Sequence, residues 1–156
     1  MKMSWLSGKD LETLIAENAD DKTHKAFLGV FSIDMLPQQL PFLPIMLIIN
    51  TQTVNLPGQH WKAVYISKEH IGEVFDSLAT PISTRLMQWL NRFTRSWTTS
   101  SLTIQNPISA TCGAFVLYYI LTRFQKRNLQ HASQIFSNNL SNNDLLMKEF
   151  VTLLKK

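Results

Sequence analysis

Cys112 is the only cysteine of the chain, and its surroundings suit a nucleophile. A Pro-containing turn precedes it, Gly113 follows it, and a long apolar segment begins directly afterwards. This pattern predicts that Cys112 stands at or near the N-terminus of a helix, where the helix dipole and the free N–H groups favour the thiolate. The alternative is a small buried hydrophobic residue, which is the commoner role of a lone cysteine.

A thiolate nucleophile needs a base, and His60 is the best placed of the four histidines. It opens a segment with an alternating strand pattern, directly after a glycine-bearing turn, and Trp61 follows it. The other three histidines lie in polar or turn segments and are expected at the surface: His24, His70 and His131. The alternative for His60 is a half-buried histidine with a structural role.

Asp76 and Gln105 could complete such a site. Asp76 ends the strand predicted beside that of His60, so its carboxylate could hold the second nitrogen of the imidazole. Gln105 ends the segment leading to Cys112, and its amide could donate to the oxyanion of acyl transfer, together with the backbone N–H of Cys112. The alternatives are an aspartate that caps a turn and a glutamine on the polar surface.

The sequence gives little support to other chemistries. A single cysteine without suitably spaced histidines near it argues against a metal site, and no glycine-rich phosphate loop is present. One cysteine excludes an internal disulfide, so a reducing compartment is expected rather than secretion. Residues 1–10 lack the apolar core of a signal peptide, and no apolar run is long enough to span a membrane, so we expect a soluble protein.

Periodicity and turn signals predict the elements that must position these residues. Strands are expected over residues 27–33, 45–51, 60–67, 71–76 and 98–105. Helices are expected over residues 7–18, 81–95 and 111–127, with two more near 131–136 and 143–154. Prolines mark a loop over residues 37–44, and residues 55–58 have turn chemistry. Segments 60–67 and 71–76 should form a hairpin, and segment 111–127, apolar on nearly all sides, should be the central buried helix.

Composition places the chain among globular domains. Its 156 residues are 45% hydrophobic and 17% charged, which suits one domain with its own core. Charge is uneven, because residues 1–84 hold 6 basic and 9 acidic side chains whereas residues 85–156 hold 9 and 2. A basic half fits either a polyanion partner or an ordinary solvated surface.

The order His60, Asp76, Gln105, Cys112 resembles that of the adenovirus proteases (adenain) and their relatives, which include the proteases of SUMO and other ubiquitin-like proteins. Papain-like enzymes usually place the cysteine before the histidine. Four stretches between residues 10 and 128 carry the resemblance: Phe27-Leu-Gly29-Val-Phe31, Gly58-Gln-His60-Trp61-Lys-Ala63, Gly72-Glu-Val-Phe75-Asp76-Ser77 and Gln105-Asn-Pro107-Ile-Ser109-Ala110-Thr-Cys112-Gly113.

The resemblance implies a role for each of the four residues and a fold. Cys112 would be the nucleophile, His60 the base, Asp76 the residue that orients His60, and Gln105 an oxyanion donor. Residues 1–156 would form a single α+β domain of the adenain-like cysteine protease fold. Its mixed or antiparallel central sheet would pack against a buried helix starting near Cys112, with flanking helices.

Two departures from the family pattern bear on the assignment. Adenoviral enzymes commonly carry Glu in place of Asp76, although other relatives use Asp. Thr111 stands where SUMO proteases typically have Asp, which favours the viral branch.

The resemblance also implies a task, which is the maturation of viral precursor proteins. The chain would be a cysteine endopeptidase of a virus, or of a Polinton (Maverick) element, that cuts capsid and core precursors at Gly-containing sites. It would act in the virion or in the host nucleus or cytoplasm, on protein substrates, without a membrane, and as a monomer. The sequence requires no cofactor. DNA and an activating peptide serve adenoviral enzymes, but a disulfide-linked peptide would here consume Cys112.

Two alternatives stay open. The chain could be a deconjugating enzyme that clips the tails of ubiquitin-like proteins. It could also be a nucleic-acid-binding or virion structural protein on a protease fold, in which case salt-sensitive DNA binding without peptidase activity is expected.

Overall fold

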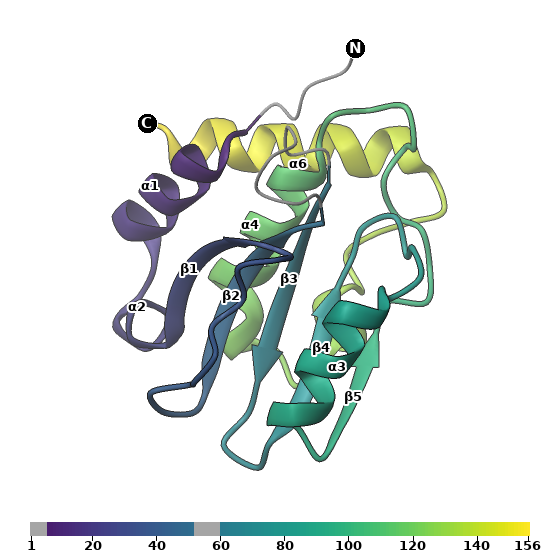
Figure 1. Ribbon diagram of the computed structural model, residues 1–156. Coiled ribbons are helices and arrows are strands. Elements are labelled where there is room, and N and C mark those ends of the chain that lie inside the picture. Colours follow the sequence, from purple (N-terminus) through teal and green to yellow (C-terminus); the bar gives the residue numbers. More distant parts are fainter. Residues whose placement is uncertain (1–5, 52–59) are drawn as a thin grey trace.

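A five-stranded mixed sheet lies at the centre of the molecule, with helices on both of its faces (Figure 1). The computed structural model describes residues 6–51 and 60–156. The strands lie in the order of the chain: β1 (Phe27–Ser32), β2 (Ile45–Asn50), β3 (Trp61–Ile66), β4 (Ile71–Phe75) and β5 (Ser96–Thr99). β2, β3 and β4 are antiparallel, whereas β1 and β5 add to the two edges in parallel. The predicted α+β class and mixed sheet are confirmed.

The strand β2 is buried on both faces of the sheet, which explains its unbroken apolar sequence. Ile45, Leu47 and Ile49 face one hydrophobic cluster, and the alternate residues Met46 and Ile48 face the other. Side chains of a strand point alternately to the two faces, so only a strand covered on both sides needs such a run. The buried strand predicted here is confirmed.

The helix α4 (Cys112–Thr122) covers one face of the sheet, and its residues are buried from Cys112 to Ile120. The helices α1 (Gly8–Asn18) and α6 (Leu140–Leu154) pack beside it (Figure 1). The predicted central buried helix is confirmed. It ends at Thr122 and is followed by a 3₁₀ turn, η1 (Arg123–Gln125), instead of continuing to residue 127.

A buried ion pair anchors the C-terminal end of α4 to the sheet. Arg123 donates from Nη2 to Glu73 Oε2 of β4 at 2.6 Å, and Tyr119 donates from its hydroxyl to Glu73 Oε1 at 2.7 Å. Buried charges are tolerated when they are paired and hydrogen-bonded in this way. These contacts hold α4 against the sheet, and Cys112 lies at the N-terminal end of this helix.

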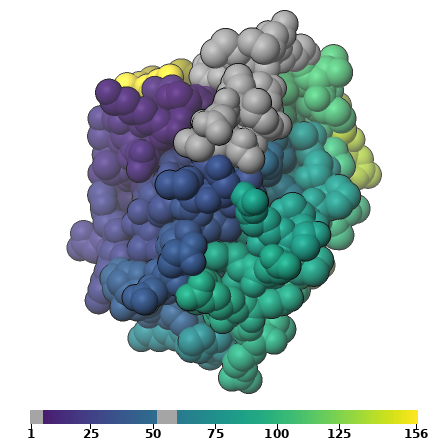
Figure 2. Space-filling view, in the orientation of Figure 1, coloured from purple at the N-terminus to yellow at the C-terminus, as the bar shows by residue number. Residues whose placement is uncertain are grey.

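The other face of the sheet is covered by α3 (Thr84–Phe93) and by the loop that joins β1 to β2. Ser83 caps α3 by accepting a hydrogen bond from Leu86 N, and Leu86, Trp89 and Leu90 face the sheet. Trp89 Nε1 donates to the carbonyl of Pro37 at 2.8 Å, which joins helix and loop. Figure 2 shows the two side by side, the loop in blue and α3 in teal.

The structure corrects one predicted strand. Residues 98–105 were expected to form it, but β5 occupies Ser96–Thr99 and residues 100–105 leave the sheet. The reason lies in their hydrogen bonds, because the N–H groups of Ile104 and Gln105 both donate to the carbonyl of Ser77 instead of to a neighbouring strand. The Thr- and Ser-rich composition indicated extended backbone but not its partner.

Helix boundaries differ from the predictions where polar caps decide them. The helix expected near residues 131–136 is α5 (Leu129–Ala132), because Asn128 caps it by accepting from His131 N. The helix expected from residue 143 begins at Leu140, after its cap Asn139. The short helix α2 (Asp21–Ala26) was not predicted, although its cap Asp20 is an ordinary helix-start signal. The turn predicted over residues 55–58 lies outside the described residues.

Candidate active site

Cys112 is the first residue of α4 and has a free thiol that is buried, with 3% of the residue exposed. Thr111 occupies the cap position, but it makes no side-chain cap to the helix. Its hydroxyl donates instead to Asp144 Oδ1 at 3.1 Å and lies 2.8 Å from the hydroxyl of Ser109. The side chain of Thr111 therefore does not compete with an anion for the first N–H groups of α4, although the N–H of Ala114 donates to the Thr111 carbonyl at 2.9 Å.

Gly113 allows close packing at this end of the helix. A Cβ atom at Gly113 would lie 3.1 Å from Cβ of Leu6 and 3.5 Å from Cδ1 of Trp61. Leu6 and Trp61 are themselves buried, so neither has open space to move into. A glycine after the cysteine is therefore a packing requirement of this site.

His60 and Asp76 are in direct contact. His60 Nε2 lies 2.5 Å from Asp76 Oδ1. His60 immediately precedes β3 and Asp76 immediately follows β4, and these two strands pair antiparallel with Ala63 opposite Phe75. The hairpin therefore brings the two side chains together, although 16 positions separate them in the sequence.

Asp76 is also the centre of a tight turn. Its Oδ1 accepts from Leu78 N at 2.9 Å, and its Oδ2 accepts from Thr80 N at 2.8 Å and from the Thr80 hydroxyl at 2.5 Å. Lys62 Nζ lies 3.3 Å from Oδ2. This fully buried carboxylate accepts the hydrogen bonds of a turn and also contacts the imidazole.

These contacts determine the charge states of the pair. Burial alone would lower the pKa of His60, but the hydrogen bond to Asp76, the neighbouring thiol of Cys112 and the charge of Asp76 raise it to about 9. Burial would raise the pKa of Asp76, but the hydrogen bond and charge of His60, together with Thr80 and Leu78, hold it well below the usual range. The site therefore favours an imidazolium next to a carboxylate at neutral pH.

The remaining ring nitrogen of His60 is the one available to Cys112. Nε2 is occupied by Asp76, whereas Nδ1 is buried and has no hydrogen-bond partner of ordinary geometry among the described residues. The thiol of Cys112 is near enough to raise the pKa of the ring. Contacts of this kind are often longer in an unliganded enzyme and shorten when substrate binds.

Gln105 is buried, and both ends of its side-chain amide are held. Its Oε1 accepts from the hydroxyl of Ser77 at 2.5 Å, and its Nε2 donates to Ser109 at 3.2 Å to the carbonyl and 3.3 Å to the hydroxyl. Because Ser77 directly follows Asp76, the segment after β4 that carries the carboxylate also orients the amide. The NH₂ group is thereby turned toward the segment that leads into Cys112.

The C-terminal helix, for which the sequence suggested only a structural role, holds this segment in place. Asn143 donates from Nδ2 to the carbonyl of Ile104 at 2.9 Å, and Asp144 accepts from Asn106 N at 3.3 Å and from Thr111. Asn143 and Asp144 are both buried near the start of α6. Their hydrogen bonds hold the chain next to Gln105 and next to Cys112.

Sequence reasoning missed several polar residues that this site uses. Lys62 was recognised only as a member of the alternating strand, although it occupies the same side of β3 as His60. Ser77, Ser109 and Asp144 gave no signal beyond their position near the motifs. The histidines predicted to lie at the surface behave differently from His60: His24 and His70 are exposed and His131 is half-buried.

Other features of the described residues do not compete with this site. They contain no cluster of three or more side chains suited to hold a metal ion. Among the helices described, none has the length and apolar character needed to cross a bilayer. A cavity of about 710 Å³ lies between residues 98–104 and 128–138, and Cys112, His60 and Asp76 are not among its lining residues.

Comparison with known proteins supports the fold. No family model matches the chain, and no curated protein matches it. Among solved structures it is similar to the ASFV pS273R protease, with a TM-score of 0.52 and 15% identity over 78% of this chain and 58% of that chain. It is also similar to the central domain of the uncharacterized Lpg1148 protein from Legionella pneumophila, with a TM-score of 0.50 and 13% identity over 82% and 88% of the two chains.

At these identities the similarity concerns the fold alone. The chain shares its α+β fold with a protease and spans little more than half the length of that enzyme. The relation is to a protease fold, and it does not single out the adenoviral branch.

Proposed function

We propose that the chain is a cysteine endopeptidase in which Cys112 is the nucleophile and His60 its base. The observation that carries the proposal is the contact of His60 Nε2 with Asp76 at 2.5 Å, which leaves Nδ1 as the ring nitrogen for Cys112, whose thiol is near enough to the ring to raise its pKa. The position of Cys112 at the start of a buried helix adds electrostatic support for a thiolate. The fold shared with the ASFV pS273R protease is consistent with this chemistry.

The geometry suggests how the reaction would proceed. The sulfur of Cys112 attacks the scissile carbonyl carbon while His60 Nδ1 holds the proton of the thiol. The same nitrogen then delivers that proton to the leaving amine, and water hydrolyses the thioester with His60 as base. Asp76 keeps the imidazole in place and stabilises its charged form throughout.

The oxyanion would be bound by the backbone N–H of Cys112 and by Gln105. The contacts to Ser77 and Ser109 define which end of the amide is oxygen and which is nitrogen, and Nε2 would exchange one of its two contacts with Ser109 for the oxyanion. Pre-oriented donors are the usual source of oxyanion stabilisation.

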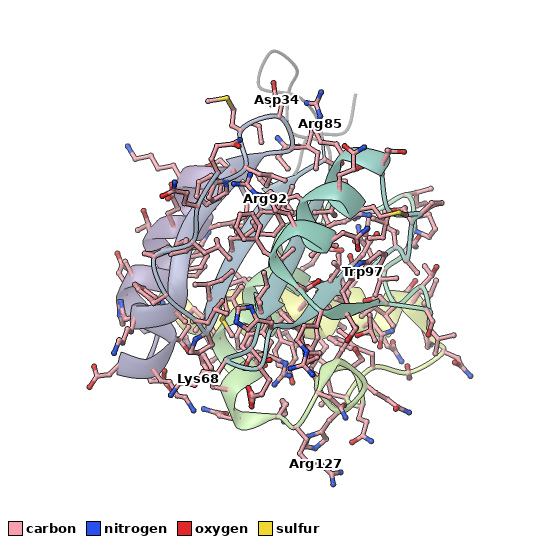
Figure 3. The ribbon with its side chains drawn as sticks, turned by 60° about the horizontal axis from the view of Figure 1, so that its bottom comes forward. Asp34, Lys68, Arg85, Arg92, Trp97 and Arg127 are labelled. Carbon is pink, nitrogen blue, oxygen red and sulfur yellow. The ribbon has the colours of Figure 1, made fainter. Side chains whose placement is uncertain are left out.

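The more specific task that we propose is maturation of viral or virus-like capsid and core precursors at Gly-containing sites. This step rests on the motif resemblance around His60 and Cys112. DNA and a non-covalently bound peptide are proposed activators. The exposed arginines of α3, Arg85 and Arg92, are candidates to contact the phosphates of DNA (Figure 3).

The test is cleavage of a proteome-derived peptide library, followed by sequencing of the new termini. Wild type should generate termini that follow Gly-containing sequences, and Cys112→Ala should generate none. The library is incubated with and without duplex DNA, so that a need for an activator is visible. Absence of Cys112-dependent cleavage in both conditions would contradict the proposal.

The same preparation separates the alternatives. Cleavage of a folded ubiquitin-like fusion but not of free peptides would favour a deconjugating enzyme. DNA binding that weakens with salt, without any cleavage, would favour a nucleic-acid-binding protein on a protease fold.

A further inference from the structure

Lys62 is a buried lysine in the middle of a sheet, and this is an unusual place for an ammonium group. The residue is 2% exposed and lies in β3, opposite Ile49 of β2. Buried charges persist where a partner compensates for lost hydration. The environment of its Nζ therefore indicates what the residue does.

Among residues 6–51 and 60–156, the ammonium contacts two groups, and both are in the segment that follows β4. Nζ lies 3.3 Å from Asp76 Oδ2 and donates to the carbonyl of Pro81 at 3.4 Å. Asp76 Oδ2 is the oxygen that His60 does not use, because His60 contacts Oδ1. Lys62 and His60 thus hold the same carboxylate from its two oxygens.

We propose that Lys62 is a positioning residue of the site, whose buried ammonium fixes Asp76 from the side opposite His60 and balances its charge. The proposal rests on the proposed function, because it concerns how the Cys112–His60 pair is maintained. It assigns no contact between Lys62 and substrate.

Charge balance gives the proposal its measurable consequence. With Lys62 present, a Cys112 thiolate, a His60 imidazolium, the Asp76 carboxylate and the ammonium sum to zero net charge. Without the ammonium the same cluster carries one net negative charge. A more negative cluster binds protons more tightly, so both the protonation of the thiolate and the deprotonation of the imidazolium should occur at higher pH.

The charged groups near this cluster are few in the neighbouring described segments. Residues 78–82 and 100–105, which pack against Asp76, contain no ionisable side chain. From α4 the group that reaches His60 is Cys112. On the face of the sheet covered by α3, the charged groups include Arg85 of α3 and Asp34 of the β1–β2 loop, both labelled at the top of Figure 3.

The experiment is the pH profile of Cys112 alkylation by iodoacetamide, measured by intact mass from pH 4 to 10. Lys62→Met removes the charge at similar length, Lys62→Arg keeps the charge, and circular dichroism verifies folding. In Lys62→Met we expect both limbs of the profile to move to higher pH by roughly half a unit to one unit, as for one charge several ångströms away in a partly screened site. Lys62→Arg should retain the wild-type limbs. Lys62→Gln is the second uncharged variant if Lys62→Met does not fold.

The outcomes distinguish this proposal from the proposed function. If wild-type Cys112 is not alkylated below pH 7, the proposed Cys112–His60 pair is itself contradicted. A reactive wild type whose limbs stay unchanged in the uncharged variants, even with lower amplitude, would leave the pair intact and overturn the role of Lys62. A purely structural lysine predicts this last result.

Discussion

Replacing Asp76 by Asn tests the network around His60 at its centre. An amide has one acceptor oxygen, so Asp76→Asn cannot serve both the donors on Oδ1, from His60 and Leu78, and those on Oδ2, from Thr80 and Lys62. The ammonium of Lys62 would lose its anionic partner in a buried position. Breaking a buried pair by removing one partner costs about 3–5 kcal/mol. At about 2–4 °C per kcal/mol for a chain of this size, the melting temperature should fall by roughly 6–20 °C.

The assay is urea unfolding at pH 7, followed by circular dichroism, for four proteins. Glu69→Gln makes the same chemical change at an exposed position in the β3–β4 turn and should alter stability by less than about 0.5 kcal/mol. The double variant Asp76→Asn/Lys62→Met removes the stranded ammonium and should recover roughly 1–2 kcal/mol relative to Asp76→Asn alone. It should not recover peptide cleavage, because the carboxylate that orients His60 is still missing.

Two results would refute this reasoning. If Asp76→Asn lies within about 1 kcal/mol of wild type, the carboxylate does not organise the turn as described. If the double variant is no more stable than Asp76→Asn, the cost does not come from an unpaired Lys62.

Three further predictions follow from the geometry. Gln105→Ala should lower kcat for peptide cleavage about 10²–10³-fold if the amide binds the oxyanion, and a loss under tenfold would remove that role. Gly113→Ala should destabilise the fold by about 1–3 kcal/mol, because its Cβ would lie 3.1 Å from Leu6 Cβ; an unchanged urea midpoint would contradict the packing at the start of α4. Stability should depend on pH through His60: its pKa is raised to about 9, so its contribution is complete below pH 6.5 and is lost as pH rises through 9. His60→Ala should flatten that part of the pH–stability curve, and an unaltered slope would count against the raised pKa.

The sequence was sufficient to predict the elements that have a strong apolar pattern. The buried strand at Ile45–Asn50 and the helix at Cys112–Thr122 carry unbroken apolar runs, and such runs are stable in water only where the element is covered on all sides. The β3–β4 hairpin followed from two alternating segments and a short connection. That hairpin in turn predicted that His60 and Asp76 lie close together.

The remainder depends on polar contacts that a single sequence does not reveal. The segment after β5 leaves the sheet and its residues Ile104 and Gln105 donate their N–H groups to the carbonyl of Ser77, and a Ser- and Thr-rich sequence gives no sign of this. The Asn143 and Asp144 side chains act on residues nearly 40 positions earlier in the chain. The burial of Lys62 was equally hidden, because an alternating strand predicts which face a residue occupies but not whether that face is covered.

The most direct test of the central claim is alkylation of Cys112 by iodoacetamide at pH 6 in wild type and in His60→Ala, read by intact mass. The single cysteine makes the mass shift specific to Cys112. An ordinary thiol, with a pKa near 8.5, reacts slowly at pH 6. Rapid labelling of wild type that falls at least tenfold in His60→Ala is the predicted result, because the imidazolium sustains the thiolate. Equal and slow labelling of both proteins at pH 6, with reaction only above pH 8, would contradict a Cys112–His60 catalytic pair.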